Sequence, residues 1–348
     1  MKMPKAKLVP LPSQPAGVAW PTEAWADSFD KDDVDRDGLS RLLDHAFAET
    51  PPGDLGETHA FLAVQGGQIV AERYWGTYSK EDTYPSWSKA KSITHALTGI
   101  LVGDGLIDIN APADVPEWQR EGDPRGAITL DQLLRMSSGL KFTEDYVDAG
   151  VSDVIDMLFG TGKADVAAFA AGFALDHEPG TAWSYASGTT NIIARCLSRA
   201  LGKAGEDFAA FMRDRLFAPI GMRSPIPKFD AAGTFIGSSF CFCTARDFAR
   251  FGLLYLRGGI WDGKRILPEG WVDYARTPTP TPDSEPLGYG AHWWLGLAGP
   301  GSFSANGYQG QYTVIVPDKD LILVRHGKSD IAQGEHVRAW LAETAACF

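Results

Sequence analysis

Ser88 and Lys91, three residues apart, are the two side chains best spaced to do chemistry together. The surrounding sequence predicts the start of a helix, where residues i and i+3 lie on one face and the lysine amine can reach the serine hydroxyl. A hydroxyl beside an amine that can take its proton is a minimal nucleophile-plus-base unit. The pair therefore predicts covalent catalysis with Ser88 as the acylated residue.

A second Ser-x-x-Lys frame, from Ser86 to Lys89, overlaps the first. On a helical wheel of about 100° per residue, Ser88 and Lys91 fall together on a polar side, whereas Ser86 and Lys89 point toward or beside the apolar side. That apolar side consists of Ala90, Ile93, Leu97, Ile100 and Leu101. The wheel favours the Ser88 frame. A purely structural alternative is an amphipathic helix whose polar face, with Ser92 and His95, lies in solvent.

A serine-lysine hydrolase also needs a proton relay and an oxyanion hole. Tyr185 follows a Pro-Gly-Thr stretch and precedes an apolar helical segment, so we expect it on a loop, where a phenol can shuttle a proton. Gly307–Gln311 precedes an apolar strand, and the backbone N–H of Gln311 could complete an oxyanion hole with the N–H of Ser88. The structural alternatives are a tyrosine in an ordinary turn and a glycine turn that enters a strand.

Composition narrows the class of protein. The chain has 348 residues and a net charge of -12 without a long basic run, which argues against a nucleic-acid partner. No segment approaches 18 continuous apolar residues and the N-terminus has no apolar signal region, so we expect a cytoplasmic protein with no membrane partner. The four cysteines lack zinc-ligand spacing, and neither a metal nor another cofactor is implied.

The pattern of predicted elements indicates an α+β protein. Strands are expected at 61–64 and 69–75 around a Gly-Gly turn, and at 312–316 and 321–324 around a turn at 317–320. Thr129 with Gln132 fits a helix capping box, and Thr244 fits an N-cap. Helices are expected at 38–49, 88–105, 130–139, 245–257 and 331–346, with 150–215 mainly helical.

This order predicts one sheet built from N- and C-terminal strands and flanked by helices, with a mainly helical subdomain inserted between them. Residues 1–35 are expected to form an N-terminal arm and residues 36–348 the main domain. Its α/β part would comprise about 36–105 and 240–348, and its helical part about 106–239.

In order and spacing, three motifs resemble those of the β-lactamase and penicillin-binding-protein superfamily, in its class C-like esterase branch. Ser88-Lys89-Ala90-Lys91 matches Ser-x-x-Lys, Tyr185-Ala186-Ser187 matches the Tyr-x-Asn box, and Tyr308-Gln309-Gly310 stands where the Lys-Thr-Gly strand motif belongs. The resemblance covers roughly residues 55–345. It implies a β-lactamase-like fold and a catalytic unit of Ser88, Lys91 and Tyr185, in which either Lys91 or Tyr185 is the base.

The run Glu144-Asp145-Tyr146-Val147-Asp148 looks most like the 6-aminohexanoate-dimer hydrolase subgroup, where a matching tyrosine lies near the amide substrate. The resemblance thus makes Tyr146 a candidate substrate-binding residue, together with Ser187, Tyr308, Gly310 and Trp293. Ser187 is shorter than the expected Asn, and Tyr308 removes the lysine that would hold a carboxylate. Aromatic walls, including Trp183 and Trp294, then favour an uncharged acyl or alkyl chain.

The predicted function is hydrolysis of small esters or linear amides, with β-lactams as poor substrates. A β-lactamase or DD-peptidase-like penicillin-binding protein is the alternative within the superfamily. An α/β-hydrolase is disfavoured because no G-x-S-x-G elbow is present. A non-catalytic ligand-binding protein on the same scaffold is disfavoured because Ser88, Lys91 and Tyr185 are all retained. The predicted partner is a small-molecule substrate, and a homodimer is left open.

Overall fold

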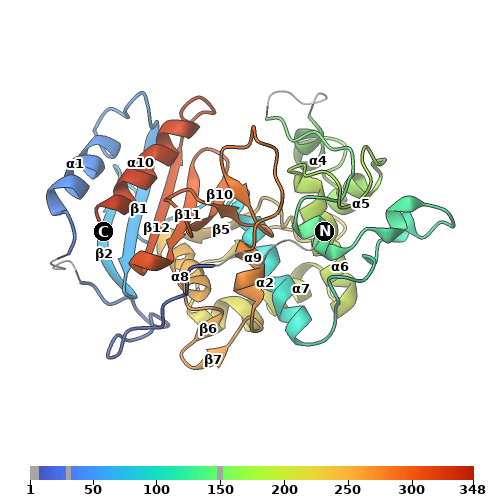
Figure 1. The fold of residues 1–348 in the computed structure, drawn as a ribbon, viewed down its shortest axis with the longest axis horizontal. Coiled ribbons are helices and arrows are strands. Elements are labelled where there is room, and N and C mark those ends of the chain that lie inside the picture. The colour runs from blue at the N-terminus through green and yellow to red at the C-terminus, as the bar shows by residue number, and fades with distance from the viewer. Residues whose placement is uncertain (1–7, 29–32, 147–151) are drawn as a thin grey trace.

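A seven-stranded antiparallel sheet forms the centre of the computed structural model, which describes residues 8–28, 33–146 and 152–348 (Figure 1). The strand order is β2-β1-β12-β11-β10-β9-β8. The sheet thus combines the first strands of the chain with the last, as the sequence predicts. Its strands are β1 (Glu57–Gln65), β2 (Gln68–Tyr74), β8 (Gly288–Tyr289), β9 (Trp294–Leu295), β10 (Phe303–Gly307), β11 (Gln311–Val316) and β12 (Leu321–Lys328).

Two hairpin turns fix the register of this sheet. Gly66 and Gly67 both have positive φ values, 58° and 76°, and connect the paired residues Gln65 and Gln68. The β11–β12 connection is a short 3-10 turn at Pro317–Lys319. Strand β12 runs four residues beyond the predicted apolar stretch because its pairing with β1 continues to its last residue, Lys328, opposite Glu57.

Two shorter sheets and ten α-helices complete the architecture of the described residues. The short sheets are β3 (Thr83–Tyr84), β5 (Cys241–Thr244) and β4 (Ile226–Pro227), and β6 (Ile260–Trp261) with β7 (Lys264–Arg265). The described helices are α1 (Arg36–Ala46), α2 (Lys89–Gly103), α3 (Leu130–Leu134), α4 (Asp153–Phe159), α5 (Val166–Ala171), α6 (Ser187–Leu201), α7 (Gly205–Met212), α8 (Ala245–Leu256), α9 (Trp271–Arg276) and α10 (Gly334–Ala346).

Helices cover both faces of the central sheet because its strands are apolar on both sides. Along β12, Leu321 and Leu323 pack with α1 and α10, whereas Ile322 and Val324 pack in the larger core with α2 and α8. Helices α4, α5 and α6 form a group at the right of Figure 1. Residues 213–217 add a turn of π-helix after α7. The fold class is the predicted one, with helices inserted between the early and late strands.

Local capping signals are confirmed, but helix α3 ends earlier than predicted. Thr129 and Gln132 form the complete capping box of α3, and Thr244 accepts a hydrogen bond from the N–H of Asp247 at the start of α8. Helix α3 ends at Leu134 rather than near Gly139, because Met136 has a φ of 57°, which no right-handed helix accommodates.

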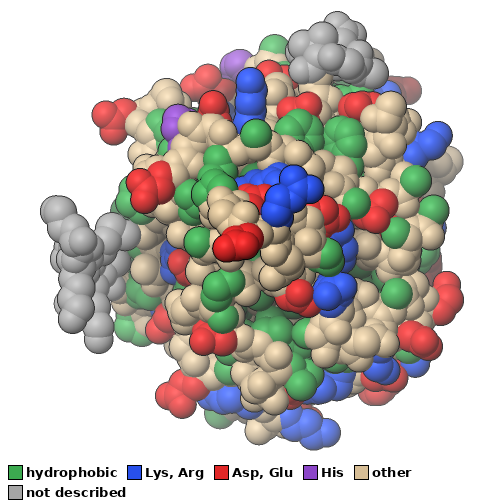
Figure 2. Space-filling model, turned by 90° about the vertical axis from the view of Figure 1, so that its right-hand side faces the viewer, with side chains coloured by type: hydrophobic (Ala, Val, Ile, Leu, Met, Phe, Trp, Pro, Cys, Tyr) green, Lys and Arg blue, Asp and Glu red, His purple; other side chains and the backbone are tan. Residues whose placement is uncertain are grey.

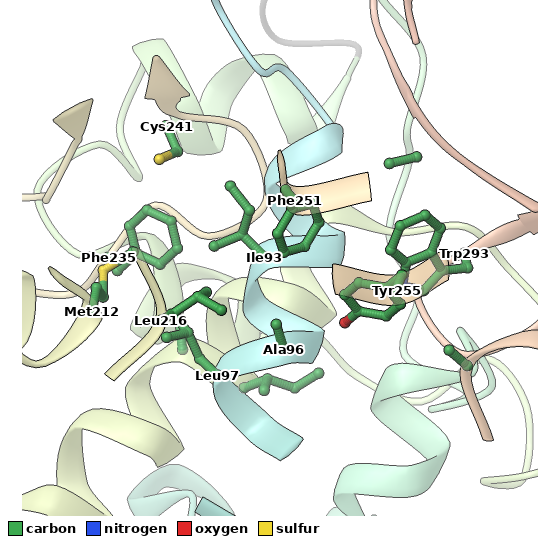
Figure 3. Close-up of a cluster of buried hydrophobic side chains, with 14 of the residues drawn as sticks. Ile93, Ala96, Leu97, Met212, Leu216, Phe235, Cys241, Phe251, Tyr255 and Trp293 are labelled. Atoms are coloured by element: carbon green, nitrogen blue, oxygen red, sulfur yellow. The ribbon is translucent and has the colours of Figure 1, made fainter. Parts of the chain in front are cut away.

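Helix α2 passes through the middle of the molecule and is buried from Lys89 to Leu101. Figure 3 shows its apolar residues Ile93, Ala96 and Leu97 within the surrounding cluster of buried side chains. The polar side is buried as well: Ser92 donates to the carbonyl of His292. The alternative of an amphipathic helix with a solvated polar face is therefore wrong.

The described part of the N-terminal segment, residues 8–28, runs along α8 with almost no regular structure. Trp25 is buried in the core and donates through Nε1 to the carbonyl of Arg246, while Arg250 donates through Nε to the carbonyl of Pro21. These contacts fasten the segment to the domain.

The surface is chemically mixed. On the face in Figure 2, acidic and basic side chains are interspersed, so this face offers no continuous basic surface of the kind that binds nucleic acid. Within the described residues, every helix is too short or too polar to span a bilayer.

Candidate active site

A strained turn places Ser88 at the start of α2. Trp87 has a φ of 44°, unusual for a bulky residue, and such conformations cluster at functional sites. Ser88 is the N-cap residue, yet its hydroxyl caps no backbone N–H. Instead, Lys91 Nζ donates to Ser88 Oγ at 3.0 Å. The structure thus brings together the two groups that the helical wheel pairs.

Lys91 is buried among oxygen acceptors. Its Nζ also donates to Ser187 Oγ at 2.8 Å and to the carbonyl of Ser238 at 3.1 Å. Burial lowers the pKa of Lys91 to about 8, and the nearby Glu144 carboxylate opposes this shift. An amine with this pKa is partly neutral near neutral pH and can then accept a proton from the serine.

Tyr185 lies immediately before α6, and its ring centre is 4.9 Å from Lys91 Nζ. Burial raises the pKa of Tyr185, the charge of Glu144 raises it further, and a side-chain hydrogen bond with Ser88 opposes the shift. At neutral pH this phenol therefore carries its proton. Tyr185 is placed to donate a proton rather than to hold a phenolate.

Glu144 is a site residue that the sequence reasoning missed. Its carboxylate accepts hydrogen bonds from the N–H of Ser187 at 2.7 Å, from Ser187 Oγ at 2.6 Å and from the hydroxyl of Tyr146 at 2.8 Å. Glu144 thereby connects the loop that carries Tyr146 to the Ser187 hydroxyl, which accepts a hydrogen bond from Lys91. Val147 and Asp148, from the same sequence run, lie outside the described residues.

The turn from β10 to β11 lies against the segment that precedes Ser88. A Cβ added to Gly307 would come within 2.4 Å of the carbonyl oxygen of Ser86, so only glycine permits this approach. Gln309 and Gly310 take positive φ values of 61° and 82° in the turn. The turn that leads into β11, where Gln311 is predicted to contribute to the oxyanion hole, therefore lies beside the segment that precedes Ser88.

Buried polar side chains hold this turn in place. Gln311 Nε2 donates to the carbonyl of Gly327 at 2.6 Å, and its Oε1 pairs with Nδ1 of His326 at 2.9 Å. Lys89 Nζ lies 3.3 Å from Nε2 of the same histidine, so the lysine of the Ser86–Lys89 frame has a structural role. Arg325 donates to the carbonyl of Gly310 at 2.8 Å, so Gly310 supports the turn through its backbone.

A cavity of about 200 Å³ opens beside the nucleophile. Ser88, Tyr146, Tyr185 and Tyr308 all line it, and the rings of Tyr146 and Tyr308 stack with centroids 4.7 Å apart. Two charged side chains that the sequence reasoning missed, Glu285 and Arg338, line it as well. Both are far from the motifs in sequence, and no local pattern marks them.

Trp293 does not reach this cavity, contrary to the prediction. It is fully buried in the core, with ring centroids 4.4 Å from Tyr255 and 5.2 Å from Phe303. The adjacent Trp294 lines the cavity instead. Neighbouring residues of extended chain point to opposite sides, so a Trp-Trp pair divides between the core and the cleft.

Comparison with known proteins identifies the family. The family model described as Beta-lactamase matches residues 57–346. The chain belongs to the β-lactamase family. A 6-aminohexanoate-dimer hydrolase of Paenarthrobacter ureafaciens is 27% identical over 285 residues, which cover 77% of this chain and 72% of that protein.

Several solved structures share the fold. A provisionally named 6-aminohexanoate-dimer hydrolase from Bacillus anthracis has a TM-score of 0.74 and 22% identity, covering 97% of this chain and 91% of that one. A family VIII carboxylesterase has a TM-score of 0.68 and 16% identity, covering 92% and 99%. A D-aminopeptidase of Cereibacter sphaeroides is 31% identical over 201 residues, and this match spans only 36% of that longer protein.

Within this β-lactamase family member, Ser187 does not line the cavity as a free polar group. Its hydroxyl donates to Glu144 and accepts from Lys91, so both of these interactions are internal. Among the described residues, no group of three or more His, Cys, Asp or Glu side chains is arranged to hold a metal ion. The side chains beside Ser88 can offer proton transfer and nucleophilic attack.

Proposed function

We propose that the protein is a serine hydrolase that cleaves small esters or linear amides through an acyl-enzyme on Ser88. The observation that carries the proposal is the 3.0 Å hydrogen bond between Ser88 Oγ and the buried Lys91 amine, whose pKa of about 8 allows a neutral form. The names of its relatives, a 6-aminohexanoate-dimer hydrolase and a carboxylesterase, fit this substrate range.

In the proposed reaction, neutral Lys91 takes the proton of Ser88 as the serine oxygen attacks the carbonyl carbon. The backbone N–H groups of Ser88 and Gln311 would stabilise the oxyanion. Tyr185 gives its proton to the leaving alcohol or amine and is reprotonated from Lys91. Water then attacks the acyl-enzyme, with the same groups removing its proton, and releases the acid and free Ser88. The raised pKa of Tyr185 supports Lys91 as the base.

Labelling with a fluorophosphonate tests the nucleophile. We expect one covalent adduct by intact-mass spectrometry, mapped to Ser88, and no adduct on Ser88→Ala. The exposed Ser284 provides a matched control, since Ser284→Ala should label like the unmodified protein. An adduct on Ser86, or undiminished turnover by Ser88→Ala, would contradict the assignment.

A paired rate measurement tests the substrate class. The hydrogen bonds of the Ser187 hydroxyl to Lys91 and Glu144 leave it poorly placed to bind the acylamide of a β-lactam. We therefore expect kcat/KM for a C2–C6 p-nitrophenyl ester to exceed that for nitrocefin on the same preparation. A nitrocefin value equal to or above the ester value would favour the lactamase alternative.

A further inference from the structure

The two residues of the second Ser-x-x-Lys frame lie on either side of the nucleophile, and the proposed reaction uses neither of them. Ser86 Oγ donates to the carbonyl of Ser239 at 2.9 Å and accepts from the N–H of Cys241 at 2.9 Å. Lys89 instead reaches the central sheet, where its Nζ lies 3.3 Å from Nε2 of His326 on β12. The short segment around the nucleophile is therefore fastened to two different parts of the fold.

The contacts of Lys89 continue as far as the turn between β10 and β11. Nδ1 of His326 pairs with Oε1 of Gln311 at 2.9 Å, and Nε2 of Gln311 donates to the carbonyl of Gln309 in that turn at 3.2 Å. Lys89, His326 and Gln311 are each at most 1% exposed, so water does not compete for these hydrogen bonds. One buried chain thus connects the first residue of α2 with the turn that leads to the proposed oxyanion donor.

The hydrogen bonds of this chain have a defined direction. The side-chain amide of Gln311 is oriented by the backbone of Gly327, whose carbonyl accepts from Nε2 at 2.6 Å and whose N–H donates to Oε1. Because Oε1 is an acceptor, Nδ1 of His326 carries the proton. Burial lowers the pKa of His326 well below its usual range, so at neutral pH the ring is neutral and its Nε2 accepts from Lys89.

Aromatic side chains hold the central imidazole of the chain in place. The ring of Tyr84 stacks on His326 with centroids 4.5 Å apart, and the ring of Phe248 lies 5.0 Å from it. The amine of Lys89 lies 3.3 Å from the centre of the same Phe248 ring. Packing on the imidazole limits its rotation, so the positions of the Lys89 amine and of the Gln311 side chain are coupled.

We propose that Lys89 is a positioning residue, which acts through His326 and Gln311 to hold Ser88 and the turn before β11 in a fixed relation. The inference rests on the proposed function, because it concerns the geometry of the oxyanion hole. A misplacement of about 1 Å in such a site can cost about 10²-fold in rate. Lys91 would exchange the proton, whereas Lys89 would keep the nucleophile aligned with the oxyanion donors.

The substitution Lys89→Met tests the proposal, since it keeps the length and the apolar body of the side chain and removes the donor. The assay is hydrolysis of p-nitrophenyl acetate per Ser88 labelled by a fluorophosphonate, so that unfolded protein does not count. We expect kcat to fall about tenfold, which is part of the about 10²–10³ that loss of an oxyanion donor costs. KM should stay within about threefold, because the alignment affects the transition state and not substrate binding.

A second variant and a matched control separate positioning from general damage to the core. His326→Leu breaks the same chain, so it should give a similar loss, and the double variant should lose no more than either single variant. Thr98→Val is the control, because Thr98 is also buried on α2 but donates only to the carbonyl of Thr94 within the helix. Its kcat per labelled site should equal that of the unmodified protein.

Nitrogen-15 NMR of the histidine rings reads the chain without turnover. The resonances of His326 are those lost in His326→Leu; they should show the proton on Nδ1, and the Nε2 resonance should shift in Lys89→Met. An unchanged kcat in Lys89→Met, a loss confined to KM, additive losses in the double variant, or a proton on Nε2 would each overturn the proposal. Failure of the proposed function would appear separately, as continued hydrolysis by Ser88→Ala.

Discussion

Replacing Glu144 with glutamine should move the pH dependence of hydrolysis toward acid. In the proposed mechanism Lys91 must lose its proton, so kcat/KM should rise with pH through the pKa of about 8. The negative charge of Glu144 favours the protonated amine and keeps this pKa up. Glutamine retains the shape and can still accept from the N–H of Ser187. The substitution therefore removes the charge while keeping the size and shape of the side chain, and the pKa of Lys91 should fall.

The structure allows the size of the shift to be worked out. Hydrogen bonds of 2.6 Å and 2.8 Å join Glu144 to Ser187 and Ser187 to Lys91, so the two charges lie within about 5.4 Å. At an effective dielectric constant of about 20, this distance corresponds to about 3 kcal/mol, or roughly two pKa units. Glu144 is only half-buried, and solvent screening reduces the effect to about one to two units. The midpoint should move to about pH 6–7.

The assay is kcat/KM for p-nitrophenyl acetate between pH 5 and 10, corrected for spontaneous hydrolysis. Asp145→Asn is the matched control, because it removes an adjacent, exposed carboxylate. Its midpoint should stay near that of the unmodified protein. A midpoint that does not move in Glu144→Gln, or that moves to higher pH, would refute the assignment of Lys91 as the titrating base.

Five further substitutions test other parts of the molecule. Lys91→Ala and Tyr185→Phe should each lower kcat by about 10³-fold or more, and the double variant should be far from additive in stopped-flow rates. Gln311→Ala should keep substantial activity, whereas Gln311→Pro removes the backbone donor and should cost about 10²–10³ in rate at matched folding by circular dichroism. Arg325→Met leaves several buried carbonyls unpaired and should lower the free energy of unfolding in urea by about 1–3 kcal/mol.

Much of the fold follows from local sequence patterns. Gly66 and Gly67 between two apolar stretches predict the β1–β2 hairpin, because both positions need a positive φ. Thr129 with Gln132 predicts the start of α3, since the capping box lies within four residues. The end of α3 was not predictable in the same way, because the positive φ at Met136 is imposed by packing rather than by residue type.

The candidate site also combines contacts that are local in the sequence with contacts between distant residues. Ser88 and Lys91 are one helical turn apart, so their contact can be predicted from spacing alone. Glu144 bonds to a residue 43 positions away, and Arg338 reaches the cavity from the last helix, so neither contact leaves a local signal. Trp293 and Trp294 have the same side chain, so residue type does not tell which of them lines the cavity. Only the side to which the backbone directs each ring decides this.

The two lysines of the Ser-x-x-Lys frames show how their surroundings separate a structural amine from a reactive one. Both are almost completely buried on the same helix, but Lys89 lies 3.3 Å from the ring centre of Phe248 and pairs with His326. Burial lowers the pKa of Lys89 well below its usual range. Lys91 instead donates to three oxygen acceptors. Burial lowers its pKa to about 8, and the Glu144 carboxylate opposes this shift. Of these two equally buried amines, Lys91 is the one that lies beside the Ser88 hydroxyl, where it can exchange a proton during a reaction cycle.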